Sequence, residues 1–245
     1  DTVRANQFKA KYLAVGDSNK SITTTKKTVA FTGDAKADFG TEPTTFGPDN
    51  SRIETWMSHD DANLYVAWQV SDKTPWVNGA TGFENLYACG DTVDFQLGSD
   101  PGADKKRGDA VKGDLRLSLG QLQGKNTAVI YRKVSDEKAA KTFYSGVWKT
   151  GYTMEFVKIL DSVKIEVKPG NGNYVVEAAI PLKDLGVNLK PGLKLKGDLG
   201  ATFSDPAGKY TSLRVYWSNQ ATGIVADEVE ELKMQPALWG EFGLE

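Results

Sequence analysis

The stretch of sequence that decides the fold is NLYVAWQVSD, residues 63–72. Its apolar side chains Leu64, Val66, Trp68 and Val70 stand at every second position. Because successive side chains of a β-strand point to opposite faces of a sheet, these four side chains would share one face. The spacing therefore predicts a strand that buries one face in a core.

The same alternation recurs along the chain, in runs bounded by Gly, Pro, Asn and Asp. Helical patterns are confined to single turns at residues 181–185 and 227–234. The sequence thus predicts an all-β protein, a two-sheet antiparallel β-sandwich of jelly-roll or immunoglobulin-like arrangement with long loops and little helix. The further predicted strands are residues 8–15, 28–32, 52–59, 91–98, 114–120, 126–133, 163–167, 174–180, 193–203, 212–217 and 241–244.

The chain shows no linker that would divide it into domains. A length of 245 residues suits one domain, since all-β domains often run to roughly 200–250 residues. The polar stretch 98–113 is typical of a long loop between neighbouring strands. The stretch 139–160 is rich in aromatic residues and is expected to pack against the body. We therefore expect a single β-sandwich domain over residues 1–245.

Composition excludes several classes of function. The 30 Lys and Arg residues nearly balance the 32 Asp and Glu residues, and a net charge of −2 argues against a nucleic-acid partner. The sequence contains no run of about 18 apolar residues that would predict a membrane span. One Cys and one His are too few for a structural zinc site or a disulfide framework.

Motifs of catalysis are also absent. The sequence has no serine-hydrolase elbow, no zinc-protease helix motif, no phosphate-binding glycine loop and no EF-hand loop. Two carboxylates can suffice for a glycosidase, but 32 acidic residues supply such pairs by chance. We therefore expect a protein that is not an enzyme, with a carboxylate-based glycan-active enzyme as an alternative.

Four segments occur in an order that has a parallel. They are DDANLYV (60–66) with VSD (70–72), GDTVDF (90–95), YVVEAAIP (174–181) and VYWSN (215–219). This order resembles the carbohydrate-binding modules of family 9 and the broader DOMON-like group. GDAKADF (33–39) stands where that family has an early motif, with Phe39 in place of its Trp.

The resemblance covers about residues 33–244, with the strands of residues 1–32 packed onto that part. It implies a β-sandwich that binds a polysaccharide or oligosaccharide without cleaving it. It also implies a module of a larger, secreted or cell-surface bacterial protein. An alternative is a structural or interaction domain of such an extracellular protein.

The alternation also predicts a polar sheet face. On three predicted strands, polar side chains fall opposite the apolar ones: Asp94 and Gln96, Arg116 and Ser118, and Arg214 and Tyr216. Carboxylates, amides and guanidinium groups suit sugar hydroxyls. By the resemblance, Asp94 and Arg116 correspond to the acidic residue and the arginine that line the family's sugar site. The alternative for Asp94 and Arg116 is a cross-strand ion pair on a solvated face.

Aromatic rings would supply the stacking surface of a sugar site. In the family two aromatic side chains clamp the sugar, and Tyr87 is the nearest match to the first. Residues 220–225 contain no aromatic residue to match the second. Trp76 follows a proline in a loop and is expected to be exposed as an alternative platform, while Tyr216 or Asn219 would complete the rim. Tyr87 could instead cover the edge of the core, and Asn219 could cap a turn.

Two kinds of bound group remain open. Some DOMON-like domains bind haem through Met and His, or Met and Lys, so a haem-binding electron-transfer domain is a further alternative, in which Met154 or Met234 could pair with His59. Met57 and His59 lie two apart on one strand and would project to the same side, which suits a haem poorly. We expect no required cofactor, but a structural calcium ion on the carboxylate-rich loops 59–63 or 98–104 is possible.

Overall fold

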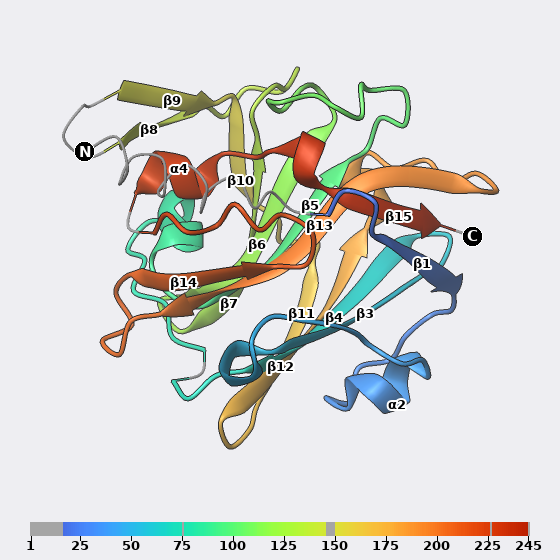
Figure 1. The fold of residues 1–245 in the computed structure, drawn as a ribbon, viewed down its shortest axis with the longest axis horizontal. Coiled ribbons are helices and arrows are strands. Elements are labelled where there is room, and N and C mark those ends of the chain that lie inside the picture. The colour runs from blue at the N-terminus through green and yellow to red at the C-terminus, as the bar shows by residue number, and fades with distance from the viewer. Residues whose placement is uncertain (1–16, 75, 146–149, 226, 245) are drawn as a thin grey trace, which may run out of the picture.

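The structure is a computed structural model that describes residues 17–244 except 75, 146–149 and 226. In this part of the chain, thirteen strands form one curled sheet (Figure 1). Eleven of them follow one another in the order β10-β7-β6-β5-β13-β15-β1-β3-β4-β12-β11, while β14 pairs with β13 and β2 with β3. The remaining two, β8 and β9, form a separate hairpin.

The strands have the following bounds. They are β1 (Ser21–Lys26), β2 (Thr44–Phe46), β3 (Ile53–His59), β4 (Asn63–Ser71), β5 (Thr92–Gly98), β6 (Asp114–Leu122), β7 (Lys125–Arg132), β8 (Lys141–Ser145), β9 (Thr150–Met154), β10 (Phe156–Ile159), β11 (Lys164–Pro169), β12 (Asn173–Pro181), β13 (Leu193–Ser204), β14 (Thr211–Tyr216) and β15 (Gly240–Leu244). The chain is thus mostly β, as the alternation predicts.

The sheet is continuous and mixed, and here the prediction of two antiparallel sheets was wrong. Strand β1 is parallel to both of its neighbours, with Ser21 opposite Glu241 of β15 and Thr25 opposite Ser58 of β3. This one strand joins the two halves along a shared edge (Figure 1). Its sequence, SITTTK, lacks apolar alternation and gives no strand signal. The strand predicted at 28–32 does not form, and the one at 8–15 lies outside the described residues.

The two halves of the sheet pack their apolar faces together. Leu64, Val66, Trp68 and Val70 of β4 share one buried cluster with residues of β5, β6 and β13, so the predicted inward face is confirmed. Burial of such side chains is the main favourable term in folding. The opposite face of β4 is covered too, because Tyr65 and neighbouring residues pack in a smaller cluster against the first short helix.

Helices are few and short among the described residues. They are α2 (Ala35–Phe39), α3 (Leu182–Leu185), α4 (Glu228–Leu232) and the 3₁₀ turns η1 (Asp49–Ser51), η2 (Phe83–Ala88) and η3 (Pro236–Leu238). The turns predicted at 181–185 and 227–234 are confirmed as α3 and α4. None of these helices has the length and apolar character needed to cross a membrane.

The two long stretches noted in the sequence, residues 98–113 and 139–160, broadly match what was expected of them. Strands β5 and β6 are paired neighbours, so residues 99–113 form the loop between them. Within this loop Arg107 Nε donates to Asp114 Oδ2 over 2.7 Å. The aromatic stretch 139–160 supplies β8, β9 and β10. It buries Phe143 and Phe156 but leaves Tyr144 56% exposed.

Candidate functional site

The structure assembles the polar sheet face that the alternation predicts. Arg116 Nη2 on β6 donates to Asp94 Oδ2 on β5 over 2.5 Å, and Ser118 Oγ donates to Asp94 Oδ1 over 2.5 Å. Tyr216 on β14 donates its hydroxyl to the same Asp94 oxygen that Arg116 contacts. Three strands therefore place their polar side chains around one carboxylate.

This cluster is buried, however, and not open to solvent. Asp94 and Ser118 are 0% exposed, Arg116 1% and Tyr216 6%. Burial lowers the pKa of Arg116, but its interactions with Asp94, Tyr216 and Tyr131 together outweigh burial, so the pKa is raised overall. Burial also raises the pKa of Tyr216 well above its ordinary value. The pair is thus an internal ion pair. The cross-strand pairing considered from the sequence is present, but the expectation of a solvated face was wrong.

The face is buried because a segment of the chain covers it. Arg116 Nη1 donates to the carbonyl oxygen of Glu231 on α4 over 2.5 Å, and Arg214 Nη2 donates to the same carbonyl over 3.2 Å. The Tyr87 ring lies 5.1 Å from the Arg116 guanidinium, and its hydroxyl donates to the Glu228 carbonyl over 2.7 Å. Residues of α4 and η2 therefore cap the polar face.

Tyr87 and Gln96 take part in this cap. Tyr87 is 0% exposed and packs with Tyr131 and Phe143 in the second buried cluster. Gln96 is 4% exposed and accepts a hydrogen bond from Trp239 Nε1 over 3.1 Å. In this conformation neither side chain offers a surface to a ligand.

The remaining two site candidates, Trp76 and Asn219, form their hydrogen bonds outside the polar cluster. Trp76 is 8% exposed, which corrects the expectation of an exposed ring. Its Nε1 donates to Asn126 Oδ1 over 2.9 Å, and its ring lies 5.1 Å from that of Tyr174. Asn219 is 7% exposed, and its Oδ1 accepts from the Ala221 amide over 2.9 Å, which is the turn cap considered from the sequence.

The three methionines named for a bound haem pack in apolar clusters, and His59 lies on β3. His59 hydrogen-bonds through Nδ1 to Thr24 Oγ1 over 2.9 Å. Met154 and Met234 instead belong to the cluster of Tyr87 and Trp239. Met57 lies on the same strand as His59, within the main core.

The loops considered for calcium use their carboxylates in turns. Asp60 Oδ1 accepts from the amides of Ala62 and Asn63, each over 2.8 Å, and Asp100 Oδ1 accepts from the Gly102 amide over 2.8 Å. Within the described ranges no group of three or more His, Cys, Asp or Glu side chains is arranged to hold a metal ion.

Several open hollows lie on the described part of the chain. The first is a groove of about 520 Å³ that includes Arg214, Tyr216 and Asn219 on and after β14. Two of its polar side chains bind other segments of the chain: Arg214 Nη1 donates to the Ile224 carbonyl over 3.3 Å, and Asn219 Nδ2 donates to Gln235 Oε1 over 3.1 Å.

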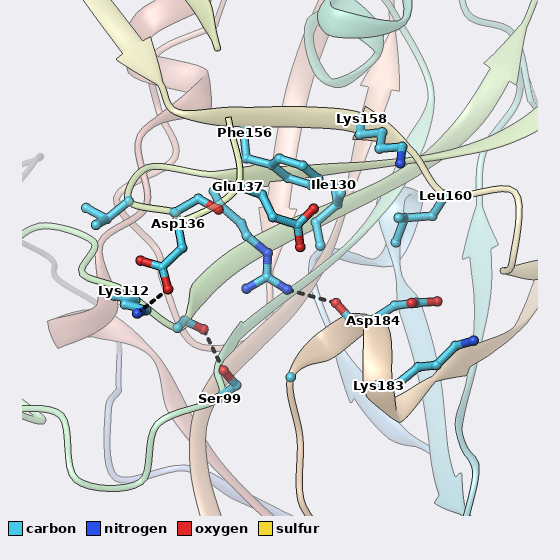
Figure 2. A pocket seen from close by; sticks show the side chains of 15 residues that line it. Ser99, Lys112, Ile130, Asp136, Glu137, Phe156, Lys158, Leu160, Lys183 and Asp184 are labelled. Carbon is cyan, nitrogen blue, oxygen red and sulfur yellow. Dashed lines mark hydrogen bonds and ion pairs between the residues drawn. The ribbon is translucent and has the colours of Figure 1, made fainter. Parts of the chain in front are cut away.

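The second hollow is a pocket of about 430 Å³ between β7, β10 and α3, called here the Arg132 pocket (Figure 2). Figure 2 shows Phe156 and Ile130 on one wall and Lys183 and Asp184 on the opposite wall, with the Glu137 carboxylate between them. Its full lining is Ser99, Lys112, Gly113, Ile130, Arg132, Val134, Ser135, Asp136, Glu137, Phe156, Lys158, Leu160, Lys183, Asp184 and Gly186.

Strand register explains why polar groups gather in this pocket. Arg132 is the last residue of β7 and has the same parity as Ile130, which faces the core. The β7–β10 ladder places Phe156 opposite Arg132 and Lys158 opposite Ile130. Arg132 Nη2 donates to the carbonyl oxygen of Asp184 over 2.8 Å, which ties β7 to α3. The pocket thus opens where the apolar face of β7 and β10 ends.

The Arg132 pocket retains groups that are free to bind. Arg132 is half-buried, and burial lowers its pKa. Of its five N–H donors, only one has a partner among the described residues. The pocket therefore combines unused donors, carboxylate acceptors and the apolar wall of Ile130 and Phe156.

Known proteins match this chain in structure but not in sequence. No family model matches the chain, and no curated protein matches it. A family 9 carbohydrate-binding module from Caldicellulosiruptor kristjanssonii, solved in complex with glucose, superposes with a TM-score of 0.52 at 16% identity, over 92% of this chain and 96% of that chain. This chain has the fold of a family 9 module.

A second structure from the same organism gives the same result. This family 9 module, solved in complex with cellotriose, has a TM-score of 0.52 at 18% identity and covers 92% of this chain and 94% of that chain. The resemblance stated from the sequence motifs is thereby confirmed for the fold. An identity of this size does not carry the ligand across.

The Arg132 pocket was missed from the sequence, although a signal for it exists. In the family 9 fold the alternation of β7 runs through Ala128 and Ile130 to Arg132, so a charged residue stands at an inward-facing position. An inward charge at the end of an apolar row is unusual. The partner wall cannot be read in this way, because only the folded chain brings α3 beside β7.

Proposed function

We propose that this chain is a non-catalytic carbohydrate-binding module and that the Arg132 pocket is its binding site. The observation that carries the proposal is an open pocket with unused planar donors beside an apolar wall, on a fold shared with modules solved with glucose and cellotriose. Its volume of about 430 Å³ falls in the usual range for small-ligand sites. Fold similarity alone would not support a function.

The pocket offers the two kinds of contact that a sugar needs. Arg132 would donate to hydroxyl oxygens with its remaining N–H groups, and Glu137 and Asp184 would accept hydroxyl hydrogens. Phe156 and Ile130 would contact the apolar C–H face of the ring. No bond is broken in this role, because the site holds the sugar only by hydrogen bonds and apolar contact.

The proposed site is separate from the polar face of Asp94, Arg116 and Tyr216. Those side chains are buried and hydrogen-bonded to one another, so a sugar would have to displace α4 to reach them. We further propose that the chain is a single module of a larger secreted or cell-surface protein, as the sequence resemblance implies. A calcium ion on its loops remains a prediction.

The test is affinity electrophoresis in gels that contain cellulose ethers, xylan or polygalacturonate. We expect retardation of the wild type in at least one gel and loss of retardation in Arg132→Gln. Arg52→Gln is the matched control, because Arg52 lies outside the pocket and its side chain is 51% exposed beside Glu54. The proposal would be contradicted if the wild type migrated equally in all of these gels and in a gel without polysaccharide.

A structural or interaction domain is the second candidate function. The observation that favours it is the buried polar cluster, since the residues that match the family's sugar site serve here to hold α4 on the sheet. The same gels separate the two functions, because a purely structural domain shows no retardation and no difference between the two arginine variants.

A further inference from the structure

The charges of the Arg132 pocket do not balance within the protein. Its lining has four basic side chains, Lys112, Arg132, Lys158 and Lys183, and three acidic ones, Asp136, Glu137 and Asp184. Lys112 is paired with Asp136. In the described part of the chain, no carboxylate comes within ion-pair distance of Arg132, Lys158 or Lys183. Three cations of the pocket lining therefore have no direct ion pair among the described residues.

The acids of the pocket do not fill this role. The Asp184 carboxylate accepts a hydrogen bond from Ser162 Oγ over 2.5 Å, and Arg132 contacts only the main-chain carbonyl of Asp184. The charges of Glu137 and Asp184 both act on Arg132 through space, but neither carboxylate forms an ion pair with it among the described residues. Two carboxylates, Glu137 and Asp184, thus stand against the three cations, and the pocket keeps a surplus of one positive charge.

Arg132 is the cation for which the missing partner matters most. A partly buried charge is costly unless an opposite charge or a full set of hydrogen bonds compensates for its lost hydration. Exposed lysines such as Lys158 and Lys183 keep their water and need no partner. The half-buried Arg132 has one hydrogen bond, so the pocket holds a desolvated guanidinium that would gain from an anion.

We propose that the sugar bound in the Arg132 pocket carries a carboxylate, as a uronic acid does. This inference rests on the proposed function and adds the class of ligand. The planar fork of a guanidinium matches the two oxygens of a carboxylate. Lys158 on β10 and Lys183 on α3 flank the same space and would add to the attraction. Glu137 and Asp184 are left to accept hydroxyl hydrogens.

The surroundings leave room for more than one sugar residue. A neighbouring hollow of about 690 Å³, separate from the two described above, shares Lys183 with the Arg132 pocket and also includes Asp61 and Asn63. Both hollows border the α3 turn. An oligosaccharide is therefore a better probe than a monosaccharide.

The test compares trigalacturonate with its fully methyl-esterified form by isothermal titration calorimetry of the whole chain. The two probes differ only at their carboxyl groups, which are charged in the acid and are uncharged methyl esters in the other form. We expect the acid to bind at least about tenfold more tightly than the ester. Arg132→Gln should abolish this preference, and Arg132→Lys should retain part of it. Lys158→Gln and Lys183→Gln should each weaken acid binding, and added salt should weaken it in the wild type.

The outcomes separate the inference from the proposed function. If acid and ester bind equally and Arg132→Gln weakens both, the pocket binds sugar but the charge preference is wrong. If the acid is preferred equally by wild type and Arg132→Gln, the carboxylate is bound elsewhere and the inference fails. If neither probe nor any neutral oligosaccharide binds, both proposals fail. Thermal unfolding of each variant checks that a lost affinity does not reflect lost folding.

Discussion

Asp94 and Arg116 form an ion pair, with 2.5 Å between Asp94 Oδ2 and Arg116 Nη2 and side chains that are 0% and 1% exposed. Neither group can regain water if the other is removed. The pair is further tied to α4 by the hydrogen bond from Arg116 to the Glu231 carbonyl. It therefore links β5, β6 and the segment that covers them.

Arg116→Ala should destabilise the protein strongly. Removing one partner leaves a buried carboxylate without its counter-ion, which typically costs about 3–5 kcal/mol in free energy of unfolding. Urea denaturation followed by tryptophan fluorescence measures this loss. Lys26→Ala is the control, because it breaks the exposed pair with Asp61 and should leave the urea midpoint close to that of the wild type. Equal midpoints for both variants would show that the buried pair does not hold the face together.

Tyr216→Phe separates stability from binding. The change removes the hydrogen bond from the buried hydroxyl to Asp94, which should cost about 1–3 kcal/mol in free energy of unfolding. The affinity for any saccharide retained by the wild type should not change, because Tyr216 does not line the Arg132 pocket. Loss of retardation in affinity gels, in a variant shown to be folded, would return the site to the polar face.

Much of the fold could be predicted from the sequence, but the joining of the two halves of the sheet by β1 could not. The alternation of Leu64, Val66, Trp68 and Val70 fixes which face of β4 is inward, and the same rule gives most of the sheet. Strand β1 was not predicted because its sequence, rich in threonine, has no apolar alternation. It is held in the sheet by main-chain pairing with β15. Parallel pairing across long sequence separations has no local signal.

The site was predictable only in part, for a related reason. Strand parity correctly places Asp94, Arg116 and Tyr216 on one face. Parity does not tell whether another segment covers that face, and here Asp227 caps α4 above it by accepting from the amides of Val229 and Glu230. The cover converts a surface that looks like a sugar site into an internal network.

Acid pH should stabilise the fold through Asp198. Burial raises the pKa of Asp198 to about 7, above its ordinary value of 3.8. Between these two pH values the folded state holds a proton that the unfolded state has lost. Its contribution is therefore full below about pH 4 and is lost as pH rises through about 7, at up to about 1.4 kcal/mol per pH unit.

This dependence is measured by urea denaturation at pH 5, 6, 7 and 8. The wild-type free energy of unfolding should fall across the series, and Asp198→Asn should show a smaller fall because it cannot ionise. Asp205→Asn serves as the control. Backbone hydrogen bonds lower the pKa of Asp205, so its titration lies below this range and the fall should persist. Parallel curves for wild type and Asp198→Asn would exclude Asp198 as the cause.

The central claim is that sugar binds in the Arg132 pocket, and amide chemical shifts of the ¹⁵N-labelled chain test it most directly. Cellotriose and trigalacturonate would be titrated separately. We expect the largest shifts at the amides of Arg132, Lys158 and Asp184, with those of Asp94 and Arg116 unchanged. Shifts centred on Asp94 and Arg116, with the pocket amides unchanged, would contradict the account.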